Sequence, residues 1–494
     1  MTRTGIFFLT LLLSLPVFAA SPKHEFRGAW VATVMCIDWP KTRGTTPEAA
    51  EAQKREFIQI LDSLEVAGAN AVLLQVRPMA DALYRSTKEP WSSYITGKRG
   101  AAPAEGWDPL KFAIDEAHNR GMELHAWVNP FRFAIGQKGN TPQDQQAINR
   151  KLIISHKNAS SGKIYSIFDP GNPEAVNHLV AVCREIVRNY DIDGMIFDDY
   201  FYPDGMPLPA GMDKETAANQ RRGYVNSAVK AVYAMIQKEK PWVRFGIAPA
   251  GVGGGNGKAT ARYNLLPPTY GSDWMYDRIY CDPLAWLAEG SVDYVSPQIY
   301  WPTNHSTNPY EPIADWWAGI AKHFKRHVYG SHNLTNIAST PAHWREQGKQ
   351  IDIDRKWPNP GSILYSMASM SGKRSGGLAN YLGNHQWEAL ALAPSMTWKH
   401  ARNPGKITGL TVGSDGQMRW NRNPAGRYVI YAIPDGKSPA QAKDPSGMNY
   451  RPQYIVGVSY TNSYVLPDWL WDGYRYAVAP YDRFGNEWPA TLAE

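Results

Sequence analysis

Cysteine is scarce in this sequence, with 3 Cys among 494 residues. Cys36, Cys183 and Cys281 provide neither a disulfide framework nor a C-x-x-C pair for a metal. One bridge among them stays open, but Cys183 lies in a helical apolar stripe and fits a buried thiol better. The sequence also lacks an H-E-x-x-H motif, so it predicts no zinc site and no cofactor.

Long hydrophobic runs are lacking as well. The apolar run near the amino terminus, residues 6–15, is shorter than the roughly 20 residues that span a bilayer. Arg3 precedes the run and the small residues Ala19 and Ala20 follow it, which is the pattern of a secretory signal peptide over residues 1–20. No Cys follows closely enough for a lipid anchor. We therefore expect an exported protein, periplasmic or secreted, without a transmembrane segment.

A strong charge of one sign is the third absence. The formal net charge is +7, and the 52 Lys and Arg residues form no basic block, which disfavours a nucleic-acid partner. Hydrophobic residues make up 43% and charged residues 20% of the chain, as in a packed globular protein. Aromatic residues, by contrast, are abundant. The 19 Trp and 27 Tyr either fill a large core or stack on sugar rings.

Short apolar runs alternate with helical patterns from about residue 26 to residue 390. The first helix, for example, opens with Thr46 and Pro47 as N-cap and first-turn proline and ends at Gly68. Strands that alternate with helices form a parallel sheet, and eight such units predict an α/β fold with a closed (β/α)₈ TIM barrel over residues 25–400. The eight expected strands are residues 26–34, 70–78, 122–133, 194–203, 243–251, 293–301, 327–334 and 362–370.

The pattern changes after the Asn-Pro-Gly sequence at residues 403–405. Short alternating strands follow, without helical segments between them. Such a pattern over residues 404–494 predicts a small all-β sandwich. Trp420 on an early strand and Tyr474 and Tyr476 on a late one resemble a fibronectin type III module, for which we expect a structural or partner-binding role.

Polar and aromatic residues gather at the carboxyl ends of the predicted strands, where a (β/α)₈ barrel carries its active site. Folding explains them poorly, because a buried polar group without a partner costs about 1–3 kcal/mol. Carboxamides, arginines and histidines can bind sugar hydroxyls, and aromatic rings can pack on a pyranose face. The eighth strand contributes Tyr365 and Ser366 to this end. The predicted catalytic residues are Asp198 and Asp199, and the predicted substrate-binding residues are Arg27, Trp30, Gln75, Arg77, His125, Trp127, Asn129, Arg132, Tyr200, Tyr202, Gln298, Tyr300, Trp301 and His332.

The paired carboxylates Asp198 and Asp199 point to a glycoside hydrolase. Such an enzyme uses an acid to protonate the leaving oxygen and a second carboxylate as nucleophile or base. Adjacent residues on a strand point to opposite sides, so only one of the two is expected to face the scissile bond. A single Asp with assistance from the substrate is the other option. The candidates for a second acid from a loop are Asp81, Asp204, Asp273 and Asp277.

Each of these assignments has a structural alternative. The Asp pair could cap the following turn or bind a cation. The arginines could form ion pairs with barrel carboxylates, the histidines could be core residues with satisfied hydrogen bonds, and the tryptophans could fill the core. These alternatives compete with a role in sugar binding residue by residue.

Five motifs in order carry a resemblance to a known family: EFRGAWVATVMCIDWP, LLQVRPMADALY, LHAWVNPFR, DGMIFDDYFYP and SPQIYW. They resemble the glycosyl-hydrolase-like family ten over roughly residues 25–400. The resemblance implies a (β/α)₈ barrel and polysaccharide hydrolysis. In bacterial members it implies cleavage of peptidoglycan glycan strands, particularly strands stripped of their stem peptides. It also implies that Asp198 and Asp199 occupy the position of a catalytic Asp, while it names no partner acid.

The sequence as a whole thus predicts an exported glycoside hydrolase that acts on a polysaccharide, with peptidoglycan or a related amino-sugar glycan as its substrate. The alternative is a non-catalytic glycan-binding or scaffolding protein that kept the barrel. Polysaccharide deacetylation is disfavoured, because the sequence lacks metal-ligand spacing. Neither the linkage nor the oligomeric state follows from the sequence.

Overall fold

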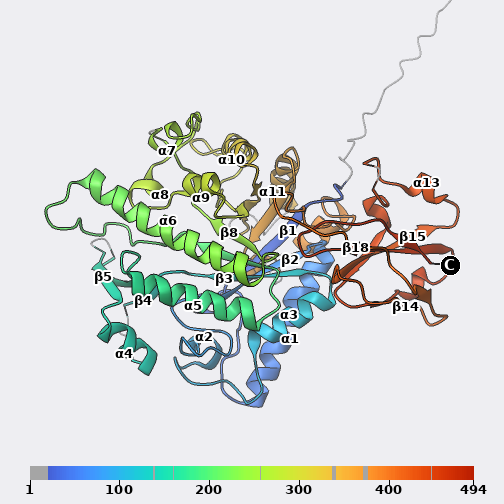
Figure 1. Ribbon diagram of the computed structural model, residues 1–494, viewed down its shortest axis with the longest axis horizontal. Helices are drawn as coiled ribbons and strands as arrows, with labels where there is room; N and C mark the ends of the chain where they lie inside the picture. The colour runs from blue at the N-terminus through green and yellow to red at the C-terminus, as the bar shows by residue number, and fades with distance from the viewer. Residues whose placement is uncertain are drawn as a thin grey trace, which may run out of the picture.

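The computed structural model describes residues 21–136, 140–158, 161–255, 257–335, 341–370, 377–446 and 448–493. The predicted signal peptide, residues 1–20, lies outside this range. Figure 1 shows a barrel of strands and helices, with a smaller all-β module at one end of the molecule. None of the described helices is both long enough and apolar enough to cross a membrane.

A parallel sheet of nine strand segments forms the centre of the described barrel. Its order is β10-β9-β8-β7-β3-β2-β1-β12-β11. Only Tyr329 separates β10 from β11, so the order ends in the stretch of chain where it begins, and the sheet curves back on itself. These two segments act as one interrupted strand, and each of the eight predicted strands is present. The segments are β1 (Phe26–Val31), β2 (Ala71–Arg77), β3 (Glu123–Val128), β7 (Gly194–Asp198), β8 (Arg244–Ala248), β9 (Tyr294–Val295), β10 (His327–Val328), β11 (Gly330–Asn333) and β12 (Gly361–Tyr365).

Helices follow the strands and surround the barrel (Figure 1). Local sequence sets their starts: Thr46, Asp108 and Asn172 each accept a hydrogen bond from a first-turn amide, and a proline follows each. Their apolar faces pack on the outward side chains of the strands in one large core. These helices are α1 (Pro47–Ala67), α3 (Pro109–Asn119), α5 (Pro173–Asn189), α6 (Lys214–Glu239), α9 (Pro283–Glu289), α10 (Tyr310–Phe324), α11 (Pro341–Asp354) and α12 (Leu378–Asn384), while the loops carry α2 (Ser93–Thr96), α4 (Pro142–Asn149), α7 (Lys258–Ala261) and α8 (Trp274–Asp277).

The third predicted strand, residues 122–133, is shorter in the structure than in the prediction. β3 ends at Val128, and Pro130 has no amide hydrogen to donate to a neighbouring strand, so pairing stops there. The chain then leaves the barrel and forms a small antiparallel sheet that the sequence pattern does not predict. Its order is β4-β6-β5, with β4 (Arg132–Ile135), β5 (Ile153–Lys157) and β6 (Ile164–Phe168).

Side chains alternate between the two sides of each barrel strand. In β1, Phe26 and Trp30 belong to the inner cluster of the barrel, together with Trp127 of β3. Ala29 and Val31 belong to the outer core, between the strands and the helices. The position of a residue along its strand therefore decides whether its side chain reaches the interior of the barrel.

Two antiparallel sheets form the C-terminal module, as the alternating pattern predicts. Met418 from one sheet and Val478 from the other share a hydrophobic core with Trp420. A short helix, α13 (Pro439–Ala442), interrupts the strands and is not predicted by the pattern. The sheet orders are β13-β14-β17 and β16-β15-β18-β19, with β13 (Thr411–Val412), β14 (Gln417–Arg419), β15 (Arg427–Pro434), β16 (Ile455–Ser459), β17 (Ser463–Val465), β18 (Tyr474–Tyr481) and β19 (Thr491–Leu492).

Buried charges join the module to the amino-terminal end of the barrel. Arg427 of β15 donates a hydrogen bond to Glu123, the first residue of β3, at 2.8 Å. Arg244 of β8 lies 3.4 Å from the same carboxylate, and Arg483 of the module lies 3.2 Å from Asp193, which precedes β7. The module thus covers the end of the barrel at which the strands begin, and the opposite end remains for a site.

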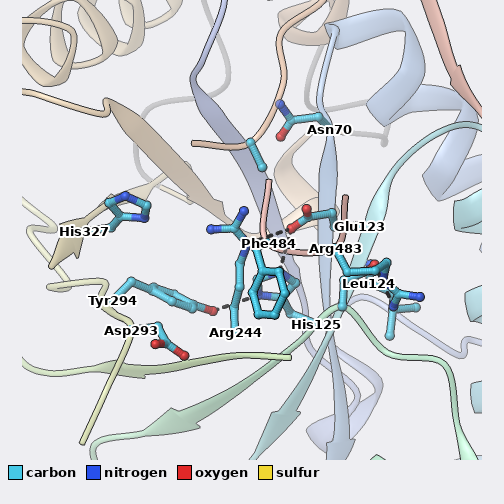
Figure 2. Close-up of polar contacts among 12 residues, drawn as sticks. Asn70, Glu123, Leu124, His125, Arg244, Asp293, Tyr294, His327, Arg483 and Phe484 are labelled. Carbon is cyan, nitrogen blue, oxygen red and sulfur yellow. Dashed lines mark hydrogen bonds and ion pairs between the residues drawn. The ribbon is translucent and has the colours of Figure 1, made fainter. Parts of the chain in front are cut away.

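Figure 2 shows this end of the barrel, where Glu123 faces Arg244 and where His125 is bonded to Tyr294. Burial alone would raise the pKa of Glu123, but Arg244, His125 and Arg427 together lower it below its ordinary value. The carboxylate is therefore ionised inside the protein, because its cationic neighbours outweigh the cost of burial.

The three cysteines are free thiols, so the bridge left open by the sequence does not form. Cys183 lies in the outer core, in agreement with its helical stripe, and burial raises the pKa of its thiol to about 12. A thiol of this kind stays protonated and unreactive at neutral pH.

Candidate active site

A cavity of about 250 Å³ opens at the carboxyl-terminal end of the barrel strands. Its walls combine residues from strand ends that lie far apart in the sequence, such as Trp30 of β1 and Asp198 of β7. Most of the lining consists of aromatic and polar side chains rather than aliphatic ones. The lining residues are Trp30, Val34, Gln75, Trp127, Arg132, Asp198, Tyr200, Ala248, Gln298, Tyr300 and Tyr365.

Asp198 is the carboxylate among these lining residues. It ends β7, two positions after Ile196 of the inner cluster, and only 8% of it is exposed. Its Oδ2 accepts a hydrogen bond from Nδ2 of Asn129 at 2.8 Å, and its Oδ1 accepts one from the amide of Asp199 at 2.9 Å. Both donors are uncharged, so they fix the carboxylate without neutralising it.

A chain of hydrogen bonds positions Asn129 in turn. Nε2 of Gln75 donates to Oδ1 of Asn129 at 2.7 Å, and Oε1 of Gln75 accepts from the amides of Thr33 and Val34 at 2.9 and 2.8 Å. Since the amide oxygen of Asn129 accepts from Gln75, its NH₂ group faces Asp198. The loop after β1 and the ends of β2 and β3 thereby fix the orientation of one carboxylate.

Asp199 lies outside the cavity lining, as strand alternation predicts for one member of the pair. Burial, followed by the negative charge of Asp198, raises the pKa of Asp199 well above its ordinary value, and Arg132 offsets only part of this. Asp199 therefore holds a proton under conditions in which an exposed Asp is ionised. The pair places one negative charge at the cavity instead of two.

Two tryptophans form part of the cavity wall. Trp30 and Trp127 meet edge to face, with their ring centroids 4.9 Å apart, and Nε1 of Trp30 donates to Oγ of Ser331 at 2.9 Å. Nε1 of Trp127, however, is buried and has no hydrogen-bond partner among the described residues. An unpaired buried donor costs about 1–3 kcal/mol, so this tryptophan is held in the wall at a cost to stability.

Three tyrosines and an arginine complete the aromatic part of the wall. Tyr300 stacks on Tyr365 with centroids 5.8 Å apart, and the guanidinium of Arg132 lies 4.9 Å from the ring centroid of Tyr200. Tyr200 is 51% exposed, so its ring is open to solvent. Flat apolar rings with a polar tip suit the C–H faces and hydroxyls of a sugar.

Comparison with known families identifies this barrel. The model of the family described as glycosyl hydrolase-like 10 matches residues 25–346. The chain belongs to the glycosyl hydrolase-like 10 family. The matched stretch includes every cavity-lining residue except Tyr365.

Relatives of this glycosyl hydrolase-like 10 protein are named as glycosyl hydrolases. Glycosyl hydrolase YngK of Bacillus subtilis (strain 168) is 34% identical over 440 residues, which cover 83% of this chain and 81% of that protein. Glycosyl hydrolase DigH of Escherichia coli (strain K12) is 33% identical over 384 residues, which cover 71% of this chain and 84% of that protein. The family and these names support glycan hydrolysis.

Solved structures overlap with the glycosyl hydrolase-like 10 chain more weakly. The PgaB (BpsB) glycoside hydrolase domain from Bordetella bronchiseptica gives a TM-score of 0.46 at 11% identity, over 73% of this chain and 99% of that one. An endo-beta-1,4-mannanase from Thermotoga petrophila gives a TM-score of 0.44 at 12% identity, over 96% and 98%. Likeness at this level carries no conclusion about substrate or mechanism.

Two predicted binding residues of the glycosyl hydrolase-like 10 barrel point outward and do not reach the cavity. Arg27 lies three positions before the inward Trp30 and therefore points to the opposite side of β1. Its Nε donates to Oε2 of Glu25 at 2.6 Å. His332 follows Ser331, which bonds to Trp30 inside the barrel, and its Nε2 lies 2.8 Å from Asp354 under the helices. Both are fully buried with partners of their own, so we remove them from the set of substrate-binding residues.

Arg77 and His125 also stay away from the cavity. The strand register shifts between Gln75 and Arg77, and Nε of Arg77 donates to Oε2 of Glu89 at 2.7 Å. His125 points into the barrel but in a layer below the cavity, where its Nδ1 lies 2.8 Å from the hydroxyl of Tyr294. We remove these two as well, because the structural alternative explains each of them.

Tyr202 and Trp301 lie near strand ends without lining the cavity. Tyr202 is 3% exposed and packs edge to face on Tyr280, with centroids 5.3 Å apart. Trp301 packs partly buried against the outer core. Asn129 does not line the cavity either, but it contacts Asp198 directly and thus positions it. The remaining eight predicted residues, half of the sixteen, come together in the lining.

None of the four candidates for a second acid lines the cavity. Asp81 is 2% exposed and lies 3.3 Å from Arg99, while Asp204 accepts a hydrogen bond from Arg278 at 2.6 Å. Asp273 and Asp277 belong to the region of α8. In the part of the chain that the structure describes, no group of three or more His, Cys, Asp or Glu residues is placed to hold a metal ion.

Three lining residues are absent from the predicted set. Tyr365 ends β12, and an aromatic residue at a strand end is a signal that the sequence carries. Val34 and Ala248 are small and apolar, and nothing in their chemistry distinguishes them from core residues. Val34 nevertheless matters, because its amide is one of the two donors that orient Gln75.

Proposed function

We propose that this chain is an exported glycoside hydrolase that cleaves peptidoglycan glycan strands or a related amino-sugar polysaccharide. The observation that carries the proposal is the placement of Asp198, a carboxylate held by Asn129 in a cavity with aromatic and carboxamide walls. Family membership supports hydrolysis of a glycan. The signal-peptide pattern of residues 1–20 supports export, and the resemblance of the five sequence motifs supports the substrate.

Asp198 is the group that we assign to the reaction. Its negative charge stabilises the positive charge that develops at the anomeric carbon as the glycosidic bond breaks. Asp199 acts through Asp198, because it retains its own proton and hydrogen-bonds to the neighbouring carboxylate. Asp199 is thus a positioning residue: in the resting site it keeps the pair at one negative charge, and it holds the proton that Asp198 passes to the leaving oxygen.

A single carboxylate in the lining fits an amino-sugar substrate. In substrate-assisted glycosidases the substrate supplies the nucleophile, in place of a second carboxylate. In our proposal the acetamido oxygen of the sugar attacks the anomeric carbon, and the leaving oxygen takes the proton of the Asp pair. Water then opens the cyclic intermediate and returns a proton to the pair.

We assign the C-terminal module to the fibronectin type III-like sandwiches. Tyr476 of β18 donates a hydrogen bond from its hydroxyl back to the carbonyl of Leu470. A tyrosine that bonds to the backbone a few residues upstream is a recurrent feature of immunoglobulin-like sandwiches. The buried contacts of Arg427 and Arg483 with the barrel support a structural role for this module.

Replacement of Asp198 tests the proposed reaction. Asp198→Asn should reduce hydrolysis by about a thousandfold or more, because the amide cannot carry the charge. The purified protein is incubated with intact peptidoglycan, peptide-stripped peptidoglycan and a panel of other glycans, and the products are identified by mass spectrometry. Asp204→Asn is the matched control, since Asp204 is partly exposed outside the cavity, and it should retain activity. Full activity of Asp198→Asn contradicts the assignment.

The same measurement separates the enzyme from a non-catalytic glycan-binding protein. If the wild-type protein binds peptide-stripped strands but releases no new reducing ends, the binding protein is the correct description. If the wild type releases new reducing ends and the Asp198→Asn variant does not, the protein is an enzyme.

A further inference from the structure

A second hollow, larger than the cavity, adjoins it. This side groove has a volume of about 1010 Å³. Neighbouring residues connect the two, because Val34 and Arg132 line the cavity whereas Met35 and Phe133 line the side groove. The loop after β1 and strand β4 therefore form a wall between the two hollows, and a chain molecule that leaves the cavity over this wall reaches the side groove.

Three cations line the side groove without a counter-charge. Arg43, Lys98 and Lys163 are exposed lining residues, and none of them forms an ion pair with a carboxylate within the described residues. The acidic residue of the lining, Asp81, is 2% exposed and is occupied by Arg99 at 3.3 Å. The surface that a bound molecule meets is therefore positive.

Aromatic rings accompany these cations. Tyr94 and Tyr165 are half-buried lining residues, and Phe133 is buried beside them in the wall. Half-buried rings offer flat apolar faces to sugar rings, while the cations suit negatively charged substituents. The combination favours a negatively charged glycan over a nucleic acid. Nucleic-acid sites carry a continuous basic surface, whereas this groove has three separate cations.

We infer that the side groove binds the continuation of the substrate strand beyond the cavity, and that Arg43, Lys98 and Lys163 bind carboxylates carried by its sugars. The inference rests on the proposed function, because it assumes that the bound glycan strand is the substrate of the hydrolase. A positively charged glycan is repelled by this surface, and an uncharged one gains nothing from the three cations. The side groove thereby selects acidic strands.

Binding to an inactive protein tests the inference without hydrolysis. Full-length Asp198→Asn protein is titrated with peptide-stripped peptidoglycan strands by calorimetry, with and without the further changes Arg43→Ala, Lys98→Ala and Lys163→Ala. Removal of the three cations should weaken binding roughly tenfold at low salt and flatten its salt dependence, since exposed charge pairs contribute modestly and are screened. The matched control removes three exposed cations of the C-terminal module, Lys406, Arg422 and Lys437.

Two further ligands identify the chemistry. In the first, the carboxyl groups of the strands are converted to amides. These strands should bind the Asp198→Asn parent protein weakly, with the affinity that acidic strands show for the variant lacking the three cations. A polyuronate tests whether a carboxylate on another sugar polymer is accepted, and equal binding places the selectivity in the charge alone. Equal affinities of the triple variant and the parent, equal loss in the control, or undiminished binding of the amidated strands overturns the inference. Binding by this route combined with no hydrolysis by the wild type would instead overturn the proposed function.

Discussion

At the scale of single residues, parity along a strand explains which predictions reached the cavity. Arg27 and Trp30 are three positions apart in β1, so they point to opposite sides, and only Trp30 lines the cavity. Asp198 and Asp199 obey the same rule. For these residues, counting positions along the strand predicts which side chain reaches the cavity. The same count fails for Arg77, because the strand register shifts after Gln75.

Asp199 gives a prediction about stability at this scale. Its pKa is higher in the folded chain than the ordinary 3.8, so its contribution favours folding at low pH and is lost as the pH rises through the folded pKa. Asp199→Asn removes this titration. The variant should therefore melt at a higher temperature than the wild type near neutral pH, and the difference should shrink as the pH falls toward about 4.

Thermal unfolding followed by circular dichroism across this pH range measures the effect. Asp472→Asn, which changes an exposed carboxyl of the C-terminal module, is the control. A difference in melting temperature that stays constant with pH would refute the role assigned to burial and to Asp198.

At the scale of elements, local signals set where helices begin. Oγ1 of Thr46 accepts a hydrogen bond from the amide of Ala49 and caps α1. Thr46→Ala should lower the free energy of unfolding by about 1 kcal/mol, because a first-turn amide loses its acceptor. Urea unfolding measures the loss, and Thr46→Ser should recover most of it. A Ser variant as unstable as the Ala variant would show that the hydroxyl does not stabilise this helix.

At the scale of the whole molecule, the buried charges between barrel and module define the most sensitive contact. Glu123→Gln leaves Arg244 and Arg427 buried without their carboxylate and should cost about 3–5 kcal/mol of stability. The lowered pKa of Glu123 means that its contribution is present above the ordinary 4.5 and is lost as the pH falls below it.

Denaturant unfolding near neutral pH and in acid checks this prediction. The difference between wild type and Glu123→Gln should narrow in acid. Asp115→Asn removes an exposed ion pair with Lys111 and should leave stability nearly unchanged. Equal stability of wild type and Glu123→Gln near neutral pH would mean that the carboxylate is not what joins the two parts.

The sequence by itself determined the eight barrel strands, the helices between them and the end of the barrel where chemistry belongs, because each follows from a periodicity or cap within one segment. It also limited the Asp pair to one inward member. Tertiary structure alone decided that Gln75 and Asn129 hold Asp198 in place. It also decided that Arg77 bonds to Glu89 and His332 to Asp354, away from the cavity, and that a positive groove lies beside the cavity. These outcomes depend on the register between distant strands and on partners from other segments, and no local pattern encodes either.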